Sequence, residues 1–189
     1  MQAKDHTHSA ASSRTPPPRW LSCPAVELRR ACEEDAEAIR QIYNVEVLGS
    51  TVTFDLVPRT EDEQRGWMQV HSGAYPAVVA VEHGDVLGFA SLSPYRPRPA
   101  YATTVEDSVY VAATSRGKGV GKALVTEIVH LAGAHGFHCV VARIVGHHEV
   151  SIALHRSCGF ELVGIERQVG RKFGRWLDVA VMQQLVGPD

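Results

Sequence analysis

The chain has 189 residues, of which 44% are hydrophobic, and a formal net charge of -2. This length and composition are typical of one globular domain with an appendage. The near-neutral charge gives no reason to expect binding to nucleic acid or to an acidic membrane surface. No apolar run approaches the roughly 18 residues that a membrane span needs.

The first 25 residues are polar and contain the prolines Pro16 to Pro18. They lack the apolar run of a secretory signal. We therefore expect a disordered Ser/Pro-rich tail over 1–25 and one domain over 26–189. The four cysteines show no CxxC spacing, which favours free thiols in a reducing, cytoplasmic compartment.

In chain order, the pattern first predicts a strand over 26–30, a helix over 33–48 and an extended, β-branched segment over 51–54. A second helix is expected from Thr60 to about His71, because Thr60 and Glu63 form a capping box. Paired strands over 77–82 and 86–93 follow, joined by a turn over 83–85.

The proline-containing segment 94–100 is predicted to be a loop. The second half then continues with strands over 103–111, 139–145, 161–169 and 176–185. Helices are expected from 120 to about 133 and over 149–158, with Gly159 just after the second one. Alternating strands and helices indicate an α/β or α+β fold with a mixed sheet.

A basic glycine loop lies between the strand over 103–111 and the helix that follows it. Its residues are Arg116, Gly117, Lys118, Gly119, Val120, Gly121 and Lys122. Glycines let the backbone approach a ligand closely, and unpaired N–H groups at a helix N-terminus attract anions. The spacing fits neither a P-loop nor a dinucleotide-binding fingerprint. A diphosphate is the most natural ligand for this loop.

The R-x-G-x-G-x pattern resembles the coenzyme A loop of the GNAT acetyltransferase superfamily. Further segments resemble its phosphinothricin and methionine sulfone/sulfoximine acetyltransferase branch. These segments are 50–54, Arg96 with 101–106, 108–111, 151–155 with 159–160, and 172–179. The resemblance implies a mixed, mostly antiparallel sheet of about seven strands flanked by helices. It also implies acetyl-CoA as co-substrate and a homodimer.

The resemblance assigns further residues around the cofactor and the acceptor. It implies that the backbone of Val109, Tyr110 and Val111 holds the pantetheine arm, with Ser151 and His148 near by. His148 stands where family members usually carry an asparagine, and an imidazole can still donate or accept a hydrogen bond. The residues expected around the acceptor are Phe54, Arg96 and Tyr101.

Acetylation of an amine requires a group that removes its proton. Glu106 and Asp107 lie in the strand before the glycine loop, and only one of them can face the acceptor because strand residues alternate between faces. We favour Glu106 as the general base. His155 is a second catalytic candidate, as a proton donor to the leaving thiolate or as a helper in deprotonation, and a purely structural role is its alternative. No metal is expected, because the histidines and cysteines lack paired ligand spacing.

The sequence thus predicts acetyl transfer from acetyl-CoA to the α-amine of a small amino-acid analogue. Arg96 favours an anionic acceptor, since arginine pairs bidentately with carboxylates. One alternative is another acceptor on the same fold, such as a protein N-terminus, a polyamine or an aminoglycoside. Another is an acyl-CoA sensor without catalysis.

Overall fold

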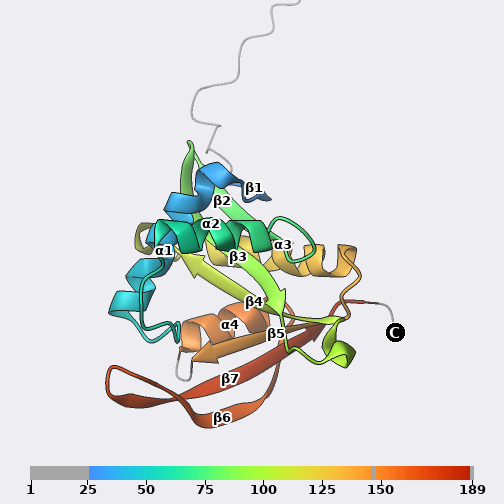
Figure 1. Ribbon diagram of the computed structural model, residues 1–189. Helices are drawn as coiled ribbons and strands as arrows, with labels where there is room; N and C mark the ends of the chain where they lie inside the picture. The colour runs from blue at the N-terminus through green and yellow to red at the C-terminus, as the bar shows by residue number, and fades with distance from the viewer. Residues whose placement is uncertain (1–25, 146–147, 188–189) are drawn as a thin grey trace, which may run out of the picture.

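The computed structural model describes residues 26–145 and 148–187. The predicted tail over 1–25 lies outside the described residues. At the centre is a seven-stranded sheet with the order β1-β2-β3-β4-β5-β7-β6 (Figure 1). Within the described ranges, no helix is long and apolar enough to cross a membrane.

The strands are β1 Glu27–Arg30, β2 Ala77–Glu82, β3 Asp85–Pro94, β4 Thr104–Val111, β5 Cys139–Val145, β6 Glu161–Lys172 and β7 Arg175–Leu185. Neighbouring strands pair antiparallel throughout the sheet except β4 and β5, which are parallel. The predicted mixed and mostly antiparallel sheet of about seven strands is therefore confirmed.

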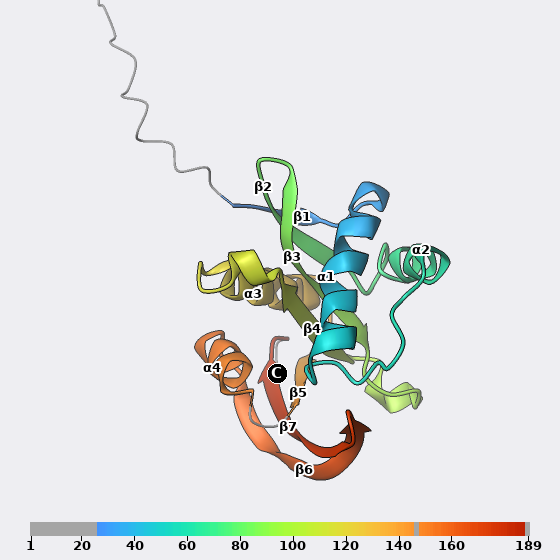
Figure 2. The ribbon, with the colours of Figure 1, turned by 90° about the vertical axis from the view of Figure 1, so that its left-hand side faces the viewer.

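Four α-helices are present in the described part of the chain: α1 Ala36–Gly49, α2 Glu61–Val70, α3 Val120–Ala134 and α4 Glu149–Ser157. Figure 2 shows α1 and α2 on one side of the sheet and α3 and α4 on the other. Each side has its own apolar core. Ile39 and Val47 of α1 pack with Phe89, and Leu124 of α3 packs with Val105.

The first predicted helix begins later than expected. Glu33–Asp35 is a separate 3-10 turn, and α1 begins at Ala36. The reason is the buried Asp35 carboxylate, which accepts a hydrogen bond from the Cys32 N–H at 2.9 Å and pairs with Arg29 at 2.6 Å. These contacts tighten the chain around the carboxylate before the helix starts.

The segment 51–54 is not extended, contrary to the prediction, but follows a series of bends. Thr53 Oγ1 lies 2.8 Å from the Tyr43 hydroxyl and accepts a hydrogen bond from the Asp55 N–H at 3.2 Å. Lys172 Nζ donates to the Thr53 carbonyl at 2.9 Å. Such polar contacts compete with strand pairing and override the β-branched composition.

The last two strands form a longer hairpin than the sequence predicted. β6 continues to Lys172 and β7 begins at Arg175. Phe173 and Gly174 between them have φ values of +50° and +75°. Positive φ at both turn residues matches the twist of a tight hairpin, so the strands pair up to the turn.

Candidate active site

The candidate site lies where β4 and β5 separate. The two strands pair only over Thr104–Asp107 of β4 and Cys139–Ala142 of β5. Beyond Asp107, β4 keeps its partner β3 but has no partner in β5, and Figure 1 shows the two strands diverging. A cavity of about 950 Å³ is lined by residues of both strands. This volume suits a small-molecule site.

Most of the predicted site residues line this one cavity. They are Phe54, Glu106, Val109, Tyr110, Val111, Arg116, Gly117, Gly119, Gly121, Lys122, His148, Ser151 and His155. Lys118, Val120, Arg96 and Tyr101 are not among the lining residues. Val120 instead packs in the core under α3, so only its backbone is available to a ligand.

The glycine loop has the conformation that an anion site requires. Gly117 and Gly119 have φ values of +75° and +84°, which favour glycine. Gly119 is the N-cap residue of α3, and no side chain caps this helix end. Because the first N–H groups of a helix have no partner within it, they and the helix dipole form an anion-binding position.

Two side-chain contacts shape this loop. The Arg116 guanidinium donates to Glu46 at 2.5 Å and to the Val111 carbonyl at 3.1 Å, so part of its charge is already neutralised. A side chain at Gly121 would begin 3.2 Å from Leu154 Cδ2 of α4. Glycine at this position therefore allows α3 and α4 to lie close together.

The two candidate carboxylates point to opposite faces of β4. Asp107 is 5% exposed and contacts α4, on the side of α3 and α4. Glu106 is half-buried and faces the side of α1 and α2 together with Tyr110. Burial raises the pKa of Glu106, the charge of Arg143 opposes this shift, and the Asp107 carboxylate adds to it. A raised pKa suits a general base that works near neutral pH.

His155 is buried at 3% exposure, and both of its ring nitrogens have partners. Nδ1 lies 2.8 Å from the Ser151 carbonyl, and Nε2 lies 3.1 Å from Asp107 Oδ2. Burial by itself lowers the pKa of His155, but the hydrogen bond and the charge of Asp107 outweigh it and raise the pKa. Since a carbonyl can only accept, Nδ1 carries a proton, and the carboxylate at Nε2 favours the imidazolium.

His148 and Ser151 lie together at the start of α4. His148 is the N-cap residue, its carbonyl accepts from the Ser151 N–H at 2.9 Å, and its side chain makes no capping bond. Burial and the nearby Arg116 charge lower the pKa of His148. The lowered pKa favours the neutral imidazole, which offers one donor and one acceptor to the cavity.

Aromatic side chains line the cavity on the side of α1. The Phe54 ring lies directly on Gly170 of β6, and Phe173 from the β6–β7 turn lines the same cavity. The Tyr110 ring packs between Tyr43 and Phe89, with centroid distances of 5.0 and 5.3 Å. Tyr110 therefore presents mainly its backbone to a ligand.

Arg96 and Tyr101 lie on the loop before β4, outside the cavity wall. The Arg96 guanidinium lies 5.0 Å from the centre of the Tyr95 ring, and that ring is 5.4 Å from Tyr101. The Arg96 charge still lowers the pKa of Glu106 as a minor effect, after burial, Arg143 and two carboxylates. Their predicted contact with the acceptor stays a prediction.

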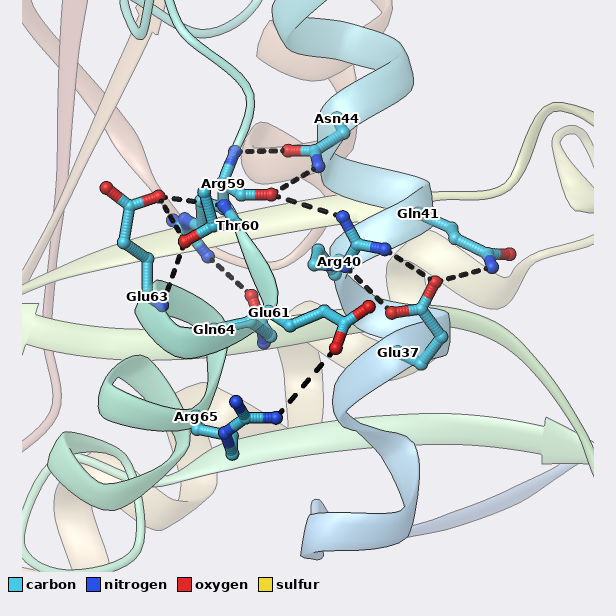
Figure 3. Close-up of polar contacts among 10 residues, drawn as sticks. All are labelled: Glu37, Arg40, Gln41, Asn44, Arg59, Thr60, Glu61, Glu63, Gln64 and Arg65. Atoms are coloured by element: carbon cyan, nitrogen blue, oxygen red, sulfur yellow. Dashed lines mark hydrogen bonds and ion pairs between the residues drawn. The ribbon is translucent and has the colours of Figure 1, made fainter.

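A polar network outside the cavity holds the end of the connection between α1 and α2 (Figure 3). The Asn44 side chain of α1 donates to the Arg59 carbonyl at 2.9 Å and accepts from the Arg59 N–H at 2.8 Å. Arg40 donates to the same carbonyl at 3.3 Å. Directly after it, Thr60 and Glu63 form the predicted capping box of α2. The connection that begins with the cavity-lining residues 49–54 is thus anchored at its far end between the two helices.

Sequence reasoning missed several cavity residues: Tyr43, Glu46, Arg143, Phe173 and Arg175. The sequence does contain a signal for one of these residues, Arg143. Arg143 is the only charged residue in the apolar run 139–145, and by strand alternation it shares a face with Glu106. Tyr43 and Glu46 carry no such signal, because they look like ordinary helix residues until α1 is packed on the sheet.

Residues 28–181 match a family model described as "Acetyltransferase (GNAT) domain". The chain belongs to the GNAT acetyltransferase family. This GNAT chain is 42% identical over 159 residues to a phosphinothricin N-acetyltransferase of Streptomyces coelicolor, covering 82% of this chain and 93% of the relative. It is 39% identical over 166 residues to an L-methionine sulfoximine/L-methionine sulfone acetyltransferase of Pseudomonas aeruginosa, covering 87% and 96%.

A solved structure gives the same result for the fold. It is a GNAT superfamily phosphinothricin acetyltransferase from Sinorhizobium meliloti in complex with AcCoA, with a TM-score of 0.82 and 44% identity. The match covers 86% of this chain and 89% of that one. The predicted family and fold are confirmed, and the chain is an N-acetyltransferase.

Proposed function

We propose that this enzyme transfers the acetyl group of acetyl-CoA directly to the α-amine of a small amino-acid analogue. Phosphinothricin, methionine sulfone and methionine sulfoximine are the leading acceptors, in keeping with the names of its relatives. The observation that carries the proposal is the cavity between β4 and β5. It joins the uncapped N-terminus of α3 to the half-buried carboxylate of Glu106.

The cofactor is proposed to bind along one side of this cavity. The N–H groups of the loop from Arg116 to Lys122 would hold the diphosphate. The part of β4 without a β5 partner, Val109–Val111, would hold the pantetheine arm through its backbone. His148 and Ser151 at the start of α4 complete this side, so the thioester would lie between β4 and β5.

The acceptor is proposed to bind on the face of α1 and α2, where Glu106 removes a proton from its ammonium group. Phe54 would pack against the acceptor, and Arg96 and Tyr101 would approach from the loop before β4. A backbone N–H near Val109–Val111 stabilises the oxyanion of the tetrahedral intermediate.

His155 is proposed to act toward the leaving thiolate. Its two ring nitrogens are engaged with Ser151 and Asp107, so it contributes first a fixed positive charge. To donate a proton to the thiolate, the ring must release one of these two partners. The Asp107 carboxylate keeps the imidazole of His155 positively charged.

A homodimer in the cytoplasm is also part of the proposal. The β6–β7 hairpin exposes large apolar side chains, namely Leu162, Val163, Ile165, Val169, Phe173 and Trp176. Apolar side chains exposed together on one hairpin are typical of protein interfaces. Light scattering after size exclusion is expected to give twice the mass of the chain, and Ile165→Lys is expected to halve that mass.

The acceptor assignment is tested by a panel of amines assayed with acetyl-CoA and a thiol-release readout. Turnover is expected with phosphinothricin or methionine sulfone and not with polyamines, aminoglycosides or peptides. Selective turnover of one of those other amines would replace the acceptor class. Tight acetyl-CoA binding without turnover of any amine would favour an acyl-CoA sensor.

A further inference from the structure

Arg143 occupies an unusual position in β5. Val140, Ala142 and Ile144 pack in the core beneath α3 and α4. Arg143 therefore points to the other face of the sheet, the face that carries Glu106. Its side chain is 26% exposed and lines the cavity. A guanidinium thus lies in the cavity wall beside the proposed base.

Glu166 of β6 holds this guanidinium in a fixed orientation. Arg143 Nη1 donates to Glu166 Oε1 at 3.2 Å, and Arg143 Nη2 lies 2.6 Å from Glu166 Oε2. Guanidinium has five N–H donors, and the hydrogen bond to Glu166 Oε1 uses one of them, whereas the contact with Oε2 is an ion pair without a hydrogen bond. Glu166 is not among the cavity-lining residues. Arg143 therefore contributes a charged group with further N–H donors to the cavity wall, whereas its carboxylate partner is not part of that wall.

Strand register places Arg143 and Arg96 on opposite sides of Glu106. Glu106 is opposite Ser93 of β3, and the loop with Arg96 follows that strand. On its other side, Glu106 is opposite Val141, and Arg143 follows two residues later toward the open end of the cleft. The charges of both arginines lower the pKa of Glu106, and the effect of Arg143 is the larger one.

An amino acid whose amine lies at Glu106 then has Arg143 of the cavity wall on one side and the loop that carries Arg96 on the other. With its carboxylate toward Arg96, its side chain extends toward Arg143. An alkyl group there would leave the N–H donors of a partly buried guanidinium without partners, which is costly. A phosphinyl or sulfonyl oxygen would accept from them, and an anionic oxygen would do so most strongly.

We propose that Arg143, oriented by Glu166, determines acceptor specificity by binding an oxygen-bearing group on the acceptor's side chain, an anionic one best. This inference rests on the proposed function, because it assumes an amino-acid acceptor with its amine at Glu106. The preferred substrates are then amino acids whose side chain carries a phosphinate, sulfone or sulfoximine oxygen, and amino acids with plain aliphatic side chains are disfavoured.

The test compares wild type, Arg143→Met and Arg96→Met on phosphinothricin, methionine sulfone and methionine. Both kcat/KM and the Kd of each acceptor in the presence of coenzyme A are measured. Arg143→Met is expected to lower kcat/KM for phosphinothricin and the sulfone by about 10- to 100-fold, the usual loss for a charged hydrogen bond. Methionine should change by less than about threefold. Arg96→Met is the matched control and is expected to weaken all three acceptors alike.

Two further variants separate specificity from stability. Arg143→Lys keeps the charge but not the fork, so it is expected to restore phosphinothricin activity only in part. Glu166→Gln keeps the shape of the wall and should give a smaller loss with the same substrate order. Retained methionine binding in each variant shows that the fold is intact.

Two results would overturn the inference. A uniform loss with all three acceptors would place Arg143 on the common α-carboxylate, and unchanged constants would make the Arg143–Glu166 pair purely structural. Failure of the proposed function is a different result: wild type itself would neither bind nor acetylate any of the three amino acids.

Discussion

Gly170→Ala is expected to damage acceptor binding from outside the acceptor pocket. A methyl group at Gly170 would lie 2.4 Å from Phe54 Cζ and 2.5 Å from Cε2, whereas ordinary contact begins at 3.4 Å. The ring must therefore move by about 1 Å. Gly170 has no positive φ value, so alanine fits the backbone itself. The strain falls on Phe54 and on the cavity wall that it forms.

The predicted magnitude follows from this displacement. A misplacement of about 1 Å near reacting groups can cost on the order of 100-fold in rate. We therefore expect acceptor kcat/KM to fall by about 10- to 100-fold. The Kd of acetyl-CoA should stay the same, because Phe54 lies against Gly170 of β6 and the proposed diphosphate position lies at the start of α3. Steady-state kinetics with the acceptor varied, together with calorimetric titration of acetyl-CoA, measures both quantities.

A double-mutant comparison makes this prediction decisive. Phe54→Ala removes the ring that Gly170→Ala displaces, so the Gly170 substitution should cost almost nothing in the Phe54→Ala background. Equal losses in the two backgrounds would refute the reasoning, because the damage would then not pass through Phe54. An unchanged acceptor kcat/KM in the single variant would refute it as well.

Three further predictions concern the base, the buried ion pair and the glycine loop. Burial raises the pKa of Glu106, so kcat/KM should decrease as the pH is lowered, with a midpoint above the ordinary carboxyl value of about 4.3. Glu106→Gln should remove this acidic limb of the pH profile and lower kcat by about 10²- to 10⁴-fold. An unaltered pH profile would exclude Glu106 as the base. The raised pKa of His155 means that its ion pair with Asp107 is fully formed at about pH 6 and stabilises the fold less as the pH rises through the raised pKa. Asp107→Asn should therefore flatten the pH dependence of the unfolding free energy above about pH 6 and cost about 3–5 kcal/mol at about that pH, whereas parallel curves for the two proteins would contradict the ion pair. Gly119→Val should weaken acetyl-CoA binding by at least about tenfold, or about 1.4 kcal/mol. Gly84→Val in the β2–β3 turn is the control, because its φ of +92° imposes similar backbone strain, and it should leave the affinity for acetyl-CoA intact. Equal acetyl-CoA affinities of the two variants would contradict the assignment of the glycine loop to the cofactor.

Local patterns in the sequence predicted most of the elements correctly, because their causes are local. The capping box of Thr60 and Glu63 places the start of α2, and the apolar spacing of α3 gives the face that packs in the core. The strands over 77–82 and 139–145 agree with β2 and β5. The same approach failed over 51–54, where contacts from Tyr43 and Lys172 hold the chain in bends.

The sequence by itself determined the family, the position of the glycine loop, and the alternation that separates Glu106 from Asp107. These depend on spacing along one strand or one loop. Only the tertiary structure decided that β4 and β5 part after Asp107, that His155 is held by that carboxylate, and that Arg143 rather than Arg96 lines the cavity. The physical reason is that a cavity wall is formed by segments distant in the chain, and their charges acquire partners only when the strands are paired and the helices packed.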